Sequence, residues 1–206
     1  MAGPADTILR LDCSPKGRDA NSSRFADEVA AKLSVLEPGA WQVYRDLAAT
    51  PPSFIDHGFT RDMNLFPVAT VASATKTLRE SEKLIGEVES ARRILIATPM
   101  HNYTVPAVLK AWIDQVVRIG RTFESTPVGK VGLLPDRPVH IVVSAGGRIV
   151  GDRARQPDFL TPYLTAVFAT IGLRDLTFYY LEGASRDEDT RTAAFRAARA
   201  QLTLLS

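Results

Sequence analysis

The segment Pro99–Tyr103 carries the side chains best suited to hold a planar, partly polar ligand. His101, Asn102 and Tyr103 are planar and amphipathic, whereas a simple connector needs only small turn-forming residues. Asn102 could orient a ring through hydrogen bonds, and His101 could donate a proton or be an ordinary packing residue. Because the apolar run Ile94–Ala97 just before it has the length of a buried strand, the segment is predicted to be a strand-to-helix loop, where open α/β sheets bind ligands.

The loop over residues 12–23 offers a candidate anion site. It contains Ser14, Asn21, Ser22 and Ser23 and leads into a run with helical periodicity. The free N–H groups of a helix start and the helix dipole favour a negative charge, although Asn21, Ser22 or Ser23 could equally be plain helix caps. The Walker pattern and the dinucleotide pattern Gly-x-Gly-x-x-Gly are both absent. A mononucleotide phosphate is therefore the ligand group that we expect here.

A third loop follows the apolar run Val139–Val143 and contains Ser144, Gly146 and Gly147. Adjacent glycines let the backbone approach a ligand without a Cβ clash, and they are equally typical of a simple turn. Taken alone, this loop does not decide between the two.

Alternating strands and helices must position these loops. Apolar or alternating runs predict five strands, at residues 7–11, 41–47, 139–143 and 176–181 and one that begins at residue 94. Helical periodicity predicts five helices: one that begins at residues 21–23 and ends at 36, two at 70–90 and 160–171, and two that begin at residues 106 and 188. Residues 56–70 lack periodicity and are predicted to be an irregular insertion, and the Gly- and Pro-rich stretch 121–137 a surface excursion. This order favours a flavodoxin-like doubly wound five-stranded parallel sheet with helices on both faces, in a single domain over residues 1–206. In that fold the strands before the three loops are neighbours.

The composition is that of a globular domain without a nucleic-acid or membrane partner. Of the 206 residues, 45% are hydrophobic and 23% charged, and the net charge is only +2. There is no run of five like charges, no apolar stretch of about 18 residues and no signal-peptide pattern. The one cysteine, Cys13, cannot form an internal disulfide. These features predict a cytoplasmic protein, and no metal site is expected.

Taken together, these segments resemble the FMN-dependent NADH-azoreductase family, which is also described as NAD(P)H:quinone reductases. The residues that carry the match are Ser14 with Asn21-Ser22, Pro99 to Tyr103, Leu109-Lys110 with Asp114, Gly120-x-Thr122-Phe123, Ser144-x-Gly146-Gly147, Pro162 to Leu164 and Ile171 to Leu173. The resemblance extends over essentially the whole chain. Ala20, His101 and Ala145 depart from the family pattern. These departures bear on the substrate range more than on flavin binding. Ser23 could replace the hydroxyl that is lost at Ala20.

The resemblance implies a homodimer with one FMN per subunit near the dimer interface. Ser14, Asn21 and Ser22 would hold the phosphate, Pro99, Met100, His101, Asn102 and Tyr103 would line the isoalloxazine and ribityl chain, and Ser144, Gly146 and Gly147 would meet the pyrimidine end. Phe123 would help to shape the substrate pocket, from the partner subunit. The implied activity is transfer of two electrons from NADH or NADPH through FMN to a quinone or azo compound by a ping-pong mechanism.

Two alternatives use the same segments. A phosphatase with Cys13 as its nucleophile needs five residues between the cysteine and an arginine, but Arg18 follows after four and Asp19 occupies the required position. A non-catalytic flavodoxin-like FMN electron carrier is the second alternative. Such carriers tend to be shorter and strongly acidic, whereas this chain is nearly neutral.

Overall fold

The computed structural model describes residues 7–65, 75–152, 154–184 and 186–205. Its centre is a five-stranded parallel sheet with the strand order β2-β1-β3-β6-β7. The strands are β1 Thr7–Asp12, β2 Trp41–Asp46, β3 Ala91–Pro99, β6 Val139–Ala145 and β7 Leu176–Glu182. This order confirms the predicted doubly wound fold, including the neighbouring positions of β1, β3 and β6.

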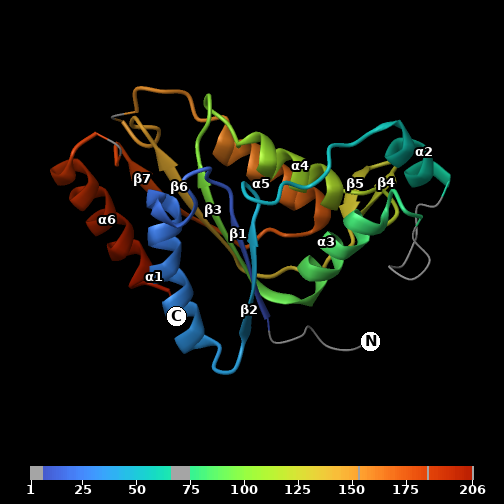
Figure 1. The fold of residues 1–206 in the computed structure, drawn as a ribbon, viewed down its shortest axis with the longest axis horizontal. Coiled ribbons are helices and arrows are strands. Elements are labelled where there is room, and N and C mark those ends of the chain that lie inside the picture. The colour runs from blue at the N-terminus through green and yellow to red at the C-terminus, as the bar shows by residue number, and fades with distance from the viewer. Residues whose placement is uncertain (1–6, 66–74, 153, 185, 206) are drawn as a thin grey trace.

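Helices cover both faces of the sheet (Figure 1). One face packs against α1 Asn21–Leu36 and α6 Glu188–Leu202, and the other against α3 Arg79–Ser90, α4 Ala107–Val116 and α5 Leu160–Ile171. Strands β1, β3 and β6 are almost entirely buried, since alternate residues of a strand face opposite helix layers. On the α1 side, Phe25 packs against Tyr179 and Phe195, with ring centroids 5.8 and 5.7 Å away. The buried indole of Trp112 belongs to the other core.

The predicted irregular insertion over 56–70 is wrong in its first part, because residues His57–Leu65 form helix α2. Asp56 begins this helix: its side-chain oxygen accepts a hydrogen bond of 2.7 Å from the N–H of Phe59. Phe59 then packs with Leu78 in a small separate cluster, next to Met63. The helix predicted over 70–90 begins at Arg79, and residues 66–74 lie outside the described part of the chain.

The predicted surface excursion over 121–137 contains an antiparallel hairpin, β4 Phe123–Thr126 and β5 Gly129–Gly132. The hairpin packs closely against the C-terminal end of α5. A Cβ at Gly132 would lie 2.1 Å from the backbone nitrogen of Gly172, so no larger residue fits there without movement. Phe123, the first residue of the hairpin, is 8% exposed. No helix among the described residues is long and apolar enough to cross a membrane.

Candidate functional site at the carboxyl edge of the sheet

The loops that follow β1, β3 and β6 lie next to one another, as the strand order requires. Two backbone hydrogen bonds connect them. The N–H of Cys13 donates to the carbonyl of Ala97 over 2.8 Å, and the N–H of Met100 donates to the carbonyl of Ser144 over 2.8 Å. The structure therefore brings the three predicted loops together at the edge where the parallel strands end (Figure 1).

The start of α1 has no side-chain cap. Ala20 occupies the N-cap position, so the prediction that Asn21, Ser22 or Ser23 caps the helix is wrong. Ser22 and Ser23 instead lie in the first turn, fully buried, and neither Oγ has a hydrogen-bond partner among the described residues. Buried hydroxyls without partners are rare because they lose hydrogen bonds to water and gain none. Two such groups beside an uncapped helix start make a site that a phosphate would satisfy.

The other two residues predicted to hold the phosphate have different surroundings. Ser14 is 5% exposed, and its Oγ accepts a weak hydrogen bond of 3.3 Å from the N–H of Lys16, so its own hydrogen is free to donate. The side-chain amide of Asn21 donates to the carbonyl of Ala184 over 2.9 Å. Asn21 therefore ties α1 to the loop after β7 through its side chain.

A buried arginine fixes the first turn of α1. Arg10 lies within β1, is 1% exposed, and binds the carboxylate of Asp12 through two nitrogens at 2.8 and 3.0 Å. The same guanidinium donates to the carbonyl of Ser23 over 3.1 Å and to the carboxylate of Asp27 over 2.5 Å. Sequence reasoning assigned no role to Arg10. In the sequence, this role is signalled by a charged residue within the apolar run that forms β1.

The loop after β3 is a tight turn that presents three side chains to solvent. The N–H of His101 donates to the carbonyl of Thr104 over 2.9 Å, and the reverse bond measures 3.0 Å. Asn102 and Tyr103 between them have φ values of +47° and +70°, in the left-handed region that few residues other than glycine adopt. The side chains of His101, Asn102 and Tyr103 are exposed. Non-glycine residues held in this region often mark ligand sites.

The loop after β6 offers backbone donors. Ser144 and Ala145 end the strand, and the N–H groups of Gly146 and Gly147 have no acceptor within the described ranges. A Cβ at Gly147 would lie 2.6 Å from the end of the exposed Gln156 side chain, which would have to move aside for a larger residue.

Two phenylalanines differ from the expectation. Phe159 was not predicted, yet its N–H donates to the carbonyl of Tyr103 over 3.0 Å and its ring is 61% exposed beside the loop after β3. Phe123 lies in β4, beyond the end of α4 that is remote from this loop (Figure 1). Within one chain Phe123 is therefore not part of the cluster.

Cys13 is not a nucleophile in this structure. The thiol is completely buried, and this burial raises its pKa far above the ordinary value, with Asp12 adding to the effect. Because only the thiolate attacks phosphate esters, this buried thiol argues against the phosphatase alternative. Among the described residues, no three His, Cys, Asp or Glu side chains are grouped as metal ligands would be.

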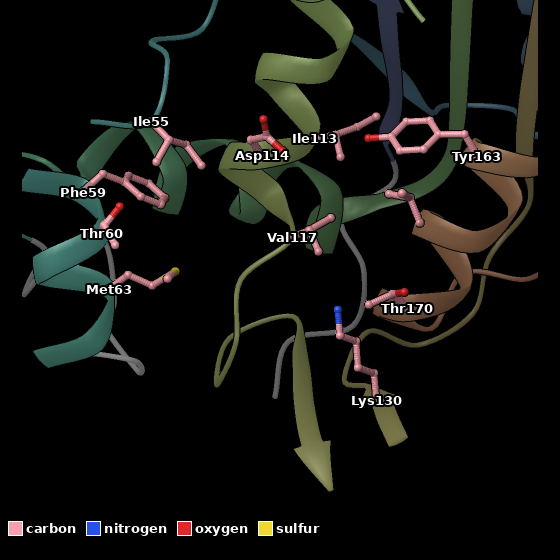
Figure 2. Close-up of a pocket in the computed structure, with 11 residues that line it drawn as sticks. Ile55, Phe59, Thr60, Met63, Ile113, Asp114, Val117, Lys130, Tyr163 and Thr170 are labelled. Atoms are coloured by element: carbon pink, nitrogen blue, oxygen red, sulfur yellow. The ribbon is translucent and has the colours of Figure 1, made fainter. Parts of the chain in front are cut away.

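A groove of about 410 Å³ lies between α2, α4, α5 and β5, and none of its residues belongs to the three loops (Figure 2). Its lining combines an apolar floor with the polar groups of Asp114, Lys130 and Tyr163. The residues that line it are Ile55, Phe59, Thr60, Met63, Ile113, Asp114, Val117, Lys130, Tyr163, Val167 and Thr170.

This fold and loop cluster define an α/β protein whose doubly wound sheet has a candidate ligand site at its carboxyl edge. The model of the family described as the flavodoxin-like fold matches residues 6–204. The chain belongs to this flavodoxin-like family.

Two relatives cover almost the whole chain. FMN-dependent NADH:quinone oxidoreductase 4 of Pseudomonas fluorescens is 46% identical over 97% of this chain and 95% of its own length. FMN-dependent NADH:quinone oxidoreductase 5 of Burkholderia lata is 46% identical over 96% of this chain and 93% of its own. These relatives confirm the family resemblance found in the sequence.

Solved structures agree in fold. An azoreductase from Bacillus anthracis aligns with a TM-score of 0.82 at 20% identity over 97% of both chains. An FMN-dependent NADH-azoreductase from the same organism, in complex with FMN, aligns with a TM-score of 0.78 at 20% identity, over 97% of this chain and 98% of that one. At such low identity the likeness establishes the fold alone.

Proposed function

We propose that this chain is an FMN-dependent oxidoreductase that takes two electrons from NADH or NADPH and delivers them to quinones or azo compounds by a ping-pong mechanism. The relatives that are 46% identical carry the name FMN-dependent NADH:quinone oxidoreductase, which supports FMN, NADH and a quinone. The FMN supplies the hydride and electron-transfer chemistry when bound. The proposal includes one FMN-binding domain over residues 1–206.

The observation that carries the proposal is the pair of unpartnered hydroxyls at the start of α1. Ser22 and Ser23 are both 0% exposed, and a phosphate in front of the uncapped first turn would accept hydrogen bonds from their Oγ atoms. The N–H groups of the same turn would donate to it as well, and the helix dipole favours its charge. Ser14 would add a further hydroxyl. The residues present therefore fit the phosphate of FMN.

The other two loops would hold and orient the ring system. The side chains of His101, Asn102 and Tyr103 project from the turn after β3, where Asn102 would donate and accept hydrogen bonds and Tyr103 would contact the ring. The unpartnered N–H groups of Gly146 and Gly147 would donate to oxygen atoms at the pyrimidine end, where backbone donors favour added negative charge. His101, which is exposed, would donate its imidazole proton to the acceptor molecule.

The proposal also includes a homodimer and a cytoplasmic site of action. The groove between α2, α4, α5 and β5 is lined by Phe59, Ile113, Val117 and Val167, and we propose that a second copy of the chain covers it (Figure 2). Phe123 would then reach the loop cluster of the partner. Cys13, whose thiol is free, is compatible with a reducing compartment.

The decisive experiment is the visible spectrum of the purified protein with FMN, before and after NADH. Flavin absorbance that bleaches with NADH and returns with a quinone is the expected result. Bound flavin that neither NADH nor NADPH reduces would favour the electron carrier. Absence of flavin binding would refute the proposal.

A further inference from the structure

The end of β7 contacts the loop after β6 through a single carboxylate. Glu182 is the last residue of β7 and pairs with Ala145 in the sheet register. Its Oε1 accepts hydrogen bonds from the N–H groups of Ile149 and Val150, over 2.5 and 2.9 Å. No cation pairs with this half-buried carboxylate in the described part of the chain, and the two backbone N–H groups are its hydrogen-bond partners within that part. Such charge-assisted hydrogen bonds are stronger than those between neutral groups.

The two bonds fix the far end of the loop. Ile149 is 5% exposed and belongs to the hydrophobic core. Val150 is partly buried and packs against this core. The carbonyl of Arg148 accepts from the N–H groups of Arg155 and Gln156, over 2.9 and 3.2 Å, which closes the chain beyond the loop. The near end is fixed by the sheet, where the N–H of Gly183 donates to the carbonyl of Ala145 over 2.8 Å.

Gly146 and Gly147 lie between these two fixed ends. Glycines are conformationally permissive, so the directions of their N–H groups depend on where the flanking residues are held. Both N–H groups lack an acceptor among the residues described. Removing the anchor at Ile149 and Val150 would therefore release the very donors that are proposed to meet the cofactor.

We propose that Glu182 is a positioning residue for the cofactor: by holding Ile149 and Val150, it places the N–H groups of Gly146 and Gly147 for FMN. This inference rests on the proposed function. It predicts that the affinity for FMN and the midpoint potential of the bound flavin both depend on an acceptor oxygen at position 182. Donors fixed near the ring favour its electron-rich form, so their release lowers the potential.

The test compares Glu182→Ala, which removes the acceptor, with Glu182→Gln, which keeps an oxygen for both N–H groups. Glu28→Ala is the matched control, because within the described ranges this carboxylate binds only Arg199, on the surface. We measure FMN dissociation constants, midpoint potentials, and hydrogen exchange of the Ile149 and Val150 amides in the protein without cofactor.

We expect Glu182→Ala to raise the dissociation constant about tenfold or more, to lower the potential, and to expose both amides to exchange. Glu182→Gln should restore most of the affinity and the protection, and Glu28→Ala should match the wild type. If Glu182→Ala does not fold, Glu182→Asp, which keeps the charge but shortens the reach by one methylene, replaces it in the comparison. Wild-type affinity and potential in the variant without the anchor would overturn the inference, whereas a wild type that binds no FMN would overturn the proposed function itself.

Discussion

At the scale of single residues, substitution of Ser22 and Ser23 tests whether their hydroxyls bind a ligand or stabilise the fold. Each Oγ is buried without a partner, so neither contributes a hydrogen bond to the folded protein alone. Ser22→Ala and Ser23→Ala should leave the apoprotein as stable as the wild type or more so, because a buried unsatisfied group is removed. Each should weaken FMN binding by about 1.5–3 kcal/mol, the value of a hydrogen bond to a charged group.

Calorimetric titration with FMN and thermal unfolding of the apoprotein measure the two effects separately. Ser34→Ala is the control, since Ser34 lies on the exposed side of the same helix and its Oγ donates to the carbonyl of Ala30. A loss of apoprotein stability with unchanged FMN affinity would mean that the two serines are structural.

Asn102 has a left-handed backbone conformation and an exposed side chain. Substitution by glycine removes the side chain and keeps the conformation, so it measures the contribution of the side chain alone. The φ of +47° at Asn102 costs glycine nothing, so Asn102→Gly keeps the turn while removing the amide. We expect unchanged thermal stability and FMN affinity weaker by about 1 kcal/mol. Asn102→Ala should weaken FMN retention too, with an added loss of stability from strain. Undiminished affinity in the glycine variant would place the Asn102 side chain outside the cofactor site.

The sequence was enough to predict which loop residues are exposed at the sheet edge. It was not enough to predict residues whose role is to hold the backbone of another segment. His101, Asn102 and Tyr103 are exposed at a sheet edge, as their amphipathic character suggested. Arg10 acts across 13 residues of chain on a carbonyl in the first turn of α1, and Glu182 acts across 33 residues on backbone N–H groups of the loop after β6. Such contacts leave no local spacing pattern.

At the scale of elements, the hairpin β4–β5 depends on backbone contact at Gly132. Its absent Cβ leaves room for the backbone nitrogen of Gly172, 2.1 Å from where that carbon would lie. Gly132→Ala should destabilise the protein by about 1–3 kcal/mol, the usual cost of overpacking. Gly86→Ala on α3 is the control, because nothing lies within 4 Å of its Cβ, and it should be neutral or stabilising. Urea unfolding measures both changes.

Strand β6 contains a buried histidine that makes stability depend on pH. His140 is 1% exposed, and burial, with Arg93 adding to it, lowers its pKa to about 4. Below the unfolded value of about 6.5 the unfolded chain binds a proton that the folded chain does not, so stability falls as pH decreases from 6.5 to 4. The contribution of His140 to this loss is about 3 kcal/mol.

Denaturant unfolding of the wild type and of His140→Gln at several pH values tests this assignment. The variant cannot titrate, so its stability should fall less steeply between pH 6.5 and 4 than that of the wild type. Parallel curves for the two proteins would assign the acid sensitivity to other groups.

Strands were predictable because buried parallel strands are nearly continuous apolar runs, as in β6. The hairpin was not, since its strands are four residues long and mostly exposed. Helix α2 was missed for a similar reason: it is short, and among the described residues its small core consists of Phe59 and Leu78 with Met63. Length and burial thus determine which elements a sequence reveals.

At the scale of the whole molecule, the sheet places the three loops at one edge. The groove between α2, α4, α5 and β5 contains none of their residues (Figure 2). Ile55, which is 42% exposed, and the half-buried Val117 line this groove in one chain, and a second copy would remove their exposed apolar surface from water. The same association would supply the Phe123 that one chain keeps apart from its own loops. Dimerisation and completion of the substrate pocket are therefore predicted to occur together.

Val167→Glu tests this coupling, because Val167 lines the groove from α5 and a carboxylate there cannot be covered without losing its hydration. We expect Val167→Glu to be a monomer by sedimentation equilibrium and to retain most of its contacts to the FMN phosphate. We expect it to reduce quinones more slowly, because no partner supplies Phe123. Thr165→Glu adds the same charge to an exposed position of the same helix and should remain dimeric and active. A Val167→Glu protein that stays dimeric would locate the interface elsewhere, and one that is monomeric yet fully active would show that a single chain contains the whole substrate pocket.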